Sequence, residues 1–305
     1  MTMKKPILLF LLVQLAYSQL WAQMPNDGLM MPSKNWCTML QASDARWSEY
    51  WEGRELRSND NLGTFINQSV LLMSNYGIND NLNVMFALPW VRTEASASYL
   101  SGQQGIQDLS LWLKWQFLKR KFGNHTLSLQ TTGGVSSPLT NYPADFQPFS
   151  IGMQSRTASL RAIVHFSLAN GLYATAQGGH SWRAKVEIDR EAYLYDNELI
   201  YDNQALVPNV VDATFRLGYL SKKIQAEAWF DYNSCLSGDD IRYNDMPLLT
   251  NYMQRSAAGA MLKYWIGPFA VSVGGNQVLA GRNMGKARTL QAAIFYQFEL
   301  KNTKN

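Results

Sequence analysis

Charged side chains recur in segments whose alternate positions are apolar, and these charges are the groups in the chain most able to act on a solute. Neighbouring side chains of a strand point to opposite faces, so the charges would share one face and the apolar residues the other. If the segments close into a barrel, the charged face lines its lumen. The predicted lumen-lining residues are Lys114, Arg161, His165, Asp212, Arg216, Glu227, Asp231 and Lys263. Opposed acids and bases across a pore can create a transverse field that selects permeants. The alternative is that the charges pair and rigidify a plugged lumen.

Groups that could catalyse a reaction are scarce. The three histidines are scattered, and the sequence has no spacing typical of metal ligands or of a phosphate-binding glycine loop. His180 and Ser181 are adjacent, but strand geometry would point His180 outward and Ser181 inward unless Gly178-Gly179 forms a bulge. We therefore predict no catalytic, cofactor-binding or metal-binding residues, and keep a lipid-modifying hydrolase as the third-ranked alternative.

Two cysteines, Cys37 and Cys235, lie far apart in the sequence, and both fall in predicted strands. In an exported protein they could form a disulfide. The other possibility is two separate thiols in a barrel wall.

The elements that must position these side chains are strands with one apolar face. In Leu109–Phe117 every odd position is large and apolar, whereas the even positions are Ser110, Trp112, Lys114 and Gln116. The pattern recurs along the chain and predicts an all-β, antiparallel transmembrane barrel. About twelve strands are predicted, at residues 36–43, 64–77, 82–94, 108–118, 125–137, 156–168, 172–188, 210–220, 224–236, 254–266, 269–279 and 288–300.

Short and long connections alternate between these strands. The short ones are at residues 78–81, 119–124, 169–171, 221–223 and 267–268. The long ones are at residues 44–61, 95–107, 142–154, 189–209, 239–252 and 280–286. Outer-membrane barrels have tight periplasmic turns and longer external loops. An even number of strands then places both chain ends on the periplasmic side.

A soluble β-sandwich would also show alternating strands. Two features favour the membrane barrel. Charges in the middle of strands would be costly to bury unpaired on a packed face, whereas a lumen can hydrate them. Aromatic residues also gather near the short turns, as in an interfacial girdle. They are Trp115, Phe117, Phe166, Tyr173, Tyr219, Tyr264, Phe269, Tyr296 and Phe298.

The N-terminus is predicted to be a cleaved signal peptide, residues 1–22, leaving residues 23–305 as the barrel. Lys4 and Lys5 precede the apolar run from Pro6 to Leu15, which is short for a membrane-spanning helix, and Ala22-Gln23 offers a cleavage site. Removing the two lysines lowers the formal net charge from +4 to +2, which is too small a bias to indicate nucleic acid.

Two long connections mix aromatic and charged residues. Residues 44–60 contain Trp47, Tyr50 and Trp51, and residues 189–209 contain three tyrosines. Such loops could bind sugars or aromatic solutes at a pore mouth. The favoured interpretation is that they fold as hairpin extensions above the membrane, with Asp196-Asn197 as a turn.

Three segments of the chain resemble those of a known family. They are Asp27–Pro32, Trp47–Gly53 and Gly105–Phe117. They are similar to outer-membrane barrels labelled "MetA-pathway of phenol degradation", most of all to the versions in Gram-negative bacteria of the Bacteroidetes type. The resemblance implies a transporter-like pore for hydrophobic or aromatic compounds. It supplies no catalytic residues, and Asp108 and Lys114 are motif positions without a further role.

The sequence thus predicts an outer-membrane channel that admits a small, aromatic or hydrophobic solute by passive diffusion. A structural or surface-interaction barrel with a closed lumen is the main alternative. The expected partners are outer-membrane lipid, a small-molecule solute and the barrel-assembly machinery during biogenesis, with no nucleic acid and no cofactor.

Overall fold

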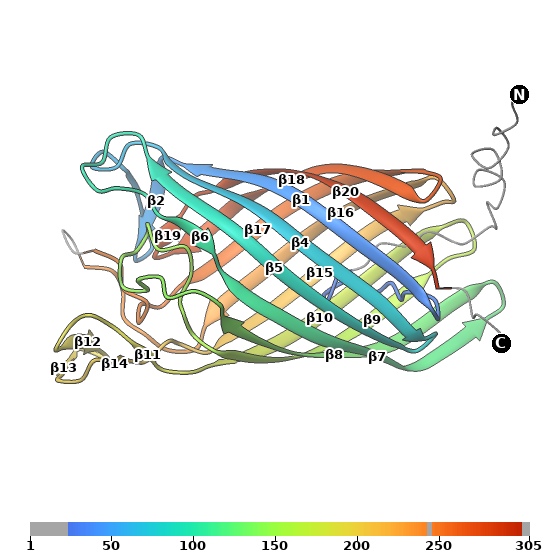
Figure 1. The fold of residues 1–305 in the computed structure, drawn as a ribbon, viewed down its shortest axis with the longest axis horizontal. Helices are drawn as coiled ribbons and strands as arrows, with labels where there is room; N and C mark the ends of the chain where they lie inside the picture. Colours follow the sequence, from blue (N-terminus) through green and yellow to red (C-terminus); the bar gives the residue numbers. More distant parts are fainter. Residues whose placement is uncertain (1–23, 243–245, 301–305) are drawn as a thin grey trace, which may run out of the picture.

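The computed structural model describes residues 24–242 and 246–300, so the predicted signal peptide lies outside the described residues. Twelve long strands close into one antiparallel barrel (Figure 1). The strands are β1 (Asn35–Trp47), β4 (Phe65–Asn79), β5 (Leu82–Ala95), β7 (Asp108–Phe122), β8 (His125–Pro138), β9 (Thr157–Ser167), β10 (Leu172–Arg183), β15 (Val210–Leu220), β16 (Ile224–Cys235), β17 (Gln254–Ile266), β18 (Phe269–Arg282) and β20 (Arg288–Glu299).

The predicted fold class and all twelve predicted strands are confirmed, with differences at the strand ends. β1 runs four residues beyond its predicted end and β7 runs on to Phe122, whereas β10 stops at Arg183 rather than at residue 188. Each barrel strand pairs with the strands before and after it, and pairing of β1 with β20 closes the ring. Strand pairing continues beyond the apolar part of a strand, so the hydropathy pattern alone does not show at which residue the strand ends.

The two ends of the barrel differ in the length of their connections. At the end that holds the short turns, hereafter the short-turn end, β7 and β8 are joined by Gly123-Asn124 and β17 and β18 by Gly267-Pro268. Gly123 and Gly267 both have positive φ, a conformation that a tight turn requires and that glycine adopts without strain. The described chain also begins and ends at this end (Figure 1).

At the opposite, long-loop end the connections fold into short strands of their own. β2 (Glu49–Glu52) and β3 (Glu55–Ser58) form a hairpin that also pairs with β19 (Met284–Gly285). β12 (Tyr193–Tyr195) and β13 (Glu198–Ile200) form a second hairpin, and β11 (Val186–Glu187) pairs with β14 (Gln204–Ala205). β6 (Gln104–Ile106) extends the sheet at β5. Asp196 and Asn197 both have positive φ, so the turn predicted there is confirmed.

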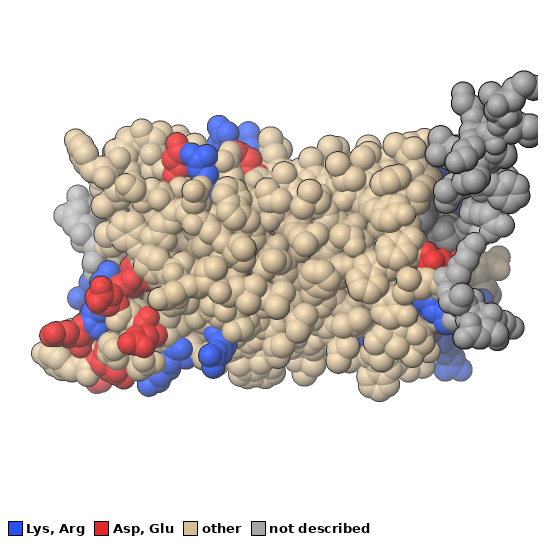
Figure 2. Space-filling view, viewed as in Figure 1, with Lys and Arg blue, Asp and Glu red and all other residues tan. Residues whose placement is uncertain are grey.

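The outer surface of the barrel is apolar. Alternate residues of the barrel strands face outward, and many of them are large, apolar and exposed, such as Leu111 and Leu113 on β7 and Leu217 on β15. Figure 2 shows a broad band without charged side chains, with charges gathered toward the ends of the molecule. A surface of this kind is expected to face lipid, where burial of apolar area replaces contact with water.

The inner surface near the short-turn end carries the largest apolar cluster. Met31 packs there against side chains from the surrounding strands, which are Cys37, Met39, Met73, Met85, Ala87, Trp265, Ala270, Ala293 and Phe295. One residue of the predicted aromatic girdle also belongs inside. Tyr173 is buried and donates a hydrogen bond to Glu227, because Leu172 rather than Tyr173 occupies the outward position of β10. That assignment was wrong, while the other eight aromatic residues of the girdle are exposed.

The two cysteines are buried and free, and they lie at opposite ends of the barrel wall. The disulfide that the sequence left open does not form. The described residues contain no helix that is long and apolar enough to cross a membrane.

The outward face gives a prediction about stability. Leu217, close to the middle of β15, and Leu199, in the β12–β13 hairpin, are both 54% exposed. An arginine near the bilayer midplane costs about 2–4 kcal/mol, whereas one in water costs almost nothing. We expect Leu217→Arg to lower the free energy of unfolding in lipid vesicles by roughly 2 kcal/mol or more, and Leu199→Arg to leave it unchanged. Equal effects of the two substitutions on urea unfolding would contradict the membrane orientation.

Candidate functional site

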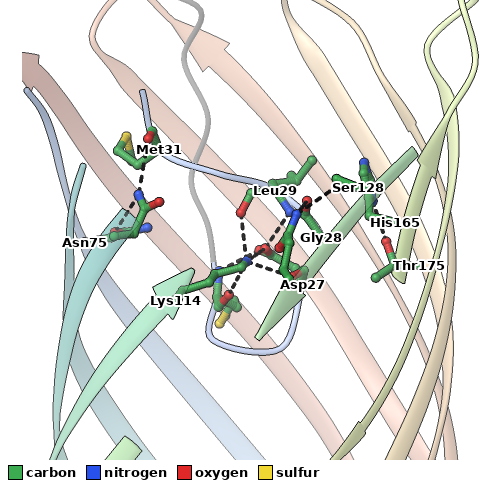
Figure 3. A network of polar contacts seen from close by, with 12 residues as sticks. Asp27, Gly28, Leu29, Met31, Asn75, Lys114, Ser128, His165 and Thr175 are labelled. Atoms are coloured by element: carbon green, nitrogen blue, oxygen red, sulfur yellow. Dashed lines mark hydrogen bonds and ion pairs between the residues drawn. The ribbon is translucent and has the colours of Figure 1, made fainter. Parts of the chain in front are cut away.

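The N-terminal segment, Met24–Ser33, lies inside the barrel near the short-turn end (Figure 3). Asp27 orders its first turn: the two carboxylate oxygens accept hydrogen bonds from the backbone N–H of Met24 at 2.6 Å and of Leu29 at 2.9 Å. An Asp-Gly turn of this kind folds the chain back on itself within a few residues. The segment therefore presents a cluster of backbone carbonyls to the wall.

Lys114 on β7 holds this turn. Its side chain is fully buried, and Nζ donates to Oδ1 of Asp27 at 2.8 Å and to the backbone oxygens of Asp27 and Leu29 at 2.7 and 2.8 Å. The carbonyl of Met24 lies at 3.3 Å. A buried ammonium is tolerated when both its charge and its hydrogen-bonding capacity are satisfied, and both conditions hold here.

Neighbouring strands add further contacts to the same segment. Gln130 on β8 donates to the carbonyl of Gly28 at 2.7 Å, and Asn83 on β5 donates to that of Met31 at 3.2 Å. His165 on β9 packs against Gly28 so closely that a Cβ at this position would overlap the imidazole ring. His165 is itself fixed by a hydrogen bond between Nδ1 and Thr175 at 2.8 Å. Glycine is therefore required at residue 28 for the segment to fit.

The remaining predicted lumen residues lie on β9 and on β15 to β17. Arg161 makes two bonds to Asp212, at 2.9 and 3.2 Å. Arg216 contacts Glu227 at 2.6 Å. Asp231 lies 3.5 Å from Arg255. The pairs of Arg216 with Glu227 and of Asp231 with Arg255 join neighbouring strands, whereas the pair of Arg161 with Asp212 spans β10, which lies between β9 and β15. All three stiffen the wall and at the same time keep their charges at the lumen surface.

An inner cavity of about 400 Å³ lies inside the barrel, and six of the eight predicted residues line it. They are Arg161, Asp212, Arg216, Glu227, Asp231 and Lys263. Lys114 and His165 lie behind the N-terminal segment instead. Apolar side chains share the lining, among them Met39, Met73 and Phe295. The cavity can thus contact both a charged group and an apolar group of one molecule.

An outer cavity of about 860 Å³ lies at the long-loop end, under the loops. Trp47, Tyr50 and Phe65 line it together with Phe149 from the connection between β8 and β9. This part of the molecule contains one of the two aromatic loops noted in the sequence. That loop folds as the favoured hairpin extension, and its aromatic residues also line a cavity.

Asn283 ties the loops together at this end. It is buried, and its amide oxygen accepts from the backbone N–H of Gly53 at 2.8 Å and of Ile241 at 3.0 Å. Its amide nitrogen donates to Asp240 and to the carbonyl of Tyr252, both at 2.7 Å. Asn283 lies between β18 and β20, so its side chain ties this loop to the loop between β1 and β4 and to the loop between β16 and β17. Its positive φ is a conformation in which asparagine is enriched.

The structure does not bring together His180 and Ser181, the pair that the sequence offered for catalysis. His180 and Ser181 follow each other on β10, whose pairing with β9 and β15 continues without a register shift. No bulge brings their side chains together. Ser181 faces the inner cavity, whereas the ring of His180 lies against that of Trp182 in a tilted contact. Among residues 24–242 and 246–300, no group of three or more His, Cys, Asp or Glu side chains could hold a metal ion.

Sequence reasoning did not predict that the N-terminal segment enters the lumen. Asp27–Pro32 was noted only as a motif of the resembling family. The available signal was an Asp-Gly turn between the predicted cleavage site and the first strand, followed by a strand lysine without a nearby acid. Nothing in the sequence indicates that this turn and this lysine contact each other.

The comparison with solved structures agrees with this geometry. The COG4313 outer membrane channel from Pseudomonas putida F1 superposes with a TM-score of 0.73 at 16% identity, over 91% of this chain and 100% of that one. The chain has the fold of an outer-membrane channel. At this identity the similarity establishes the fold alone.

Other solved barrels are more distant. The NanC porin matches with a TM-score of 0.47 at 7% identity, covering 83% of this chain and 98% of that one. A mutant of the TodX monoaromatic hydrocarbon channel matches with a TM-score of 0.46 at 9% identity, covering 89% and 91%. No family model and no curated protein matches the sequence.

The buried lysine gives a prediction about stability. Lys114→Met leaves the Asp27 carboxylate and two carbonyls buried without their cation, and breaking a buried pair in this way costs about 3–5 kcal/mol. Lys121→Met on the same strand removes an exposed lysine and serves as the matched control. We expect urea unfolding in vesicles to show a large loss for Lys114→Met alone. A loss that is equal for both variants would mean that Lys114 does not hold the segment.

The loop network gives a prediction about pH. The Arg282 guanidinium makes two hydrogen bonds of 2.7 Å to Asp240, and they hold the pKa of that carboxyl below its usual range. A pKa lowered by folding contributes stability that is complete above the unfolded value, about 3.9, and is lost as the pH falls through the folded value. When the pH lies above the unfolded pKa of about 3.9, we expect pepsin to cleave the connection between β16 and β17 more slowly in the wild type than in Asp240→Asn. The two rates should begin to converge as the pH falls below about 3.9 and should become equal only below the lowered pKa of Asp240. A ratio that stays constant with pH would be the contrary result.

Proposed function

We propose that the protein is an outer-membrane channel that admits a small, aromatic or hydrophobic solute by passive diffusion. The observation that carries this proposal is the inner cavity of about 400 Å³, enclosed by a barrel whose outside is apolar and whose lining mixes ion pairs with apolar side chains. A cavity of this size matches small-molecule sites rather than sites for polymers. The outer cavity, lined by aromatic residues, would collect the solute.

In this proposal the short-turn end faces the periplasm and the long loops face outward, as in other barrels of this kind. The resemblance of three segments to the MetA-pathway barrels supports an aromatic or hydrophobic solute. Outer-membrane lipid and the barrel-assembly machinery are the partners that such a protein requires. The ion pairs of the lining would select among solutes by their charge, since no element that could couple an energy source is present in the described residues.

A structural barrel with a closed lumen is the second candidate, and a specific observation favours it. The N-terminal segment lies in the lumen and is held by three consecutive strands through Lys114, Gln130 and Asn83. If this segment stays in place, it narrows the short-turn end. The channel requires that the segment leave a passage beside it or move out of the lumen. The structural barrel requires that it stay in place and close the lumen.

The experiment is electrical recording of the purified barrel in planar bilayers. We expect discrete conductance steps for the wild type and larger steps for Lys114→Met, because the N-terminal segment is then released from the lumen. We also expect phenol to reduce the current by occupying the inner cavity. Lys121→Met, which leaves the segment anchored, should conduct as the wild type does.

A barrel that carries no current in the wild type and none in Lys114→Met would overturn the channel and favour the structural candidate. Conductance that phenol leaves unchanged would keep a channel but contradict the aromatic or hydrophobic solute.

A further inference from the structure

Lys263 on β17 differs from the other charged residues that line the inner cavity. Its side chain is only 1% exposed, yet in the part of the chain that the structure describes its Nζ makes no hydrogen bond and no ion pair. Its contacts are with two aromatic rings: Nζ lies 3.6 Å from the ring centroid of Phe295 and 5.0 Å from that of Trp265. Rings stabilise a cation, but much less than a carboxylate does.

The contrast with its neighbours is clear. Arg161 and Arg216 each contact a carboxylate on another strand, and Lys114 contacts Asp27 of the N-terminal segment. The cavity lining includes five Lys and Arg side chains and four Asp and Glu side chains. A buried ammonium without a counter-ion carries a large desolvation cost that an anion entering the cavity would offset.

An apolar surface begins beside this lysine. Strand register places Trp265 opposite Ala270, Ala270 opposite Phe295, Phe295 opposite Met39 and Met39 opposite Met73. These five residues therefore form one row across β17, β18, β20, β1 and β4, and all are buried on the inner face. Lys263 precedes Trp265 by two positions, so it lies on the same face, one step nearer the long loops.

The row and the lysine meet at the inner cavity. Phe295, Met39 and Met73 line it together with Lys263. Thioether side chains adapt their shape to a ligand and make favourable contacts with aromatic rings. A flat apolar group could rest on these three residues while a negative group at its end reached Nζ of Lys263.

We propose that the inner cavity binds a small organic anion, with its carboxylate on Lys263 and its aromatic or short aliphatic body on Phe295, Met39 and Met73. The inference rests on the proposed channel function and adds the charge of the solute to it. The geometry favours a carboxylate with one apolar end over a sugar, because Nζ of Lys263 has no hydrogen bond or ion pair among the described residues and lies at the edge of an apolar row. A phenol or another neutral aromatic would fill the apolar part and leave the ammonium unpaired.

The test measures by calorimetry how tightly benzoate and benzyl alcohol bind to the full mature protein in detergent. The two probes have the same ring and nearly the same size, and they differ in charge. We expect the wild type to bind benzoate more tightly than benzyl alcohol. Lys263→Met should weaken benzoate binding by about tenfold or more, as expected for loss of one charge-assisted hydrogen bond, and leave benzyl alcohol unchanged.

Two further variants serve as controls. Lys263→Arg keeps the charge and should retain the preference for benzoate, and Lys223→Met removes an exposed lysine of a short turn and should behave as the wild type. Heat-modifiable mobility on gels reports whether each variant is folded. If Lys263→Met does not fold, the comparison of the two probes in the wild type and in Lys263→Arg still decides the proposal.

Equal affinity of the wild type for benzoate and benzyl alcohol would overturn the proposal, as would an absence of benzoate binding or its retention in Lys263→Met. These outcomes are separate from failure of the channel function. Binding in detergent needs no conduction, so a barrel that binds benzoate but carries no current would remove the channel and leave the anion site. A barrel that conducts but binds benzoate and benzyl alcohol equally well would keep the channel function and remove the anion site.

Discussion

Closure of the sheet between β1 and β20 is the constraint on which the rest of this structure depends. Lipid offers no hydrogen-bonding partners, so a sheet with a free edge would leave a row of backbone N–H and C=O groups unpaired at a large cost in free energy. Here the register of β1 with β20 runs without interruption from Asn35 opposite Glu299 to Arg46 opposite Arg288. Once the ring is closed, each side chain of a strand must point either to lipid or to the lumen.

That division explains how a chain with charges in the middle of its strands can lie in a membrane. Arg161, Asp212, Arg216 and Glu227 line the lumen, where each arginine lies beside a carboxylate of another strand. Pairing lowers the cost of taking these groups out of bulk water, and the cavity next to them leaves room for solvent or solute. The wall is therefore stiff where it is charged, and the adaptable part of the lining is the row of methionine and aromatic side chains.

Two lysines show what the interior does with a buried cation. Lys114 is surrounded by carbonyls and a carboxylate of the N-terminal segment, and it acts as an anchor for the chain. Lys263 is buried to nearly the same degree, but its Nζ contacts two aromatic rings and makes no hydrogen bond or ion pair with the described residues. The same residue type on the same inner surface thus serves structure in one place and leaves a charge available for a ligand in the other. The difference comes from which groups the fold brings to each position.

The sequence by itself determined the strands, the face on which most of their side chains lie and the alternation of short and long connections. These properties follow from a period of two residues and from local turn chemistry, such as Asp196-Asn197. Tyr173 was misplaced because its neighbour Leu172 is equally apolar, and only the register shows which of the two faces the lumen. Contacts across the lumen had no such signal. The pairing of Lys114 with Asp27, the packing of Gly28 on His165 and the isolation of Lys263 join residues far apart in the chain, and only the closed barrel decides how near they come.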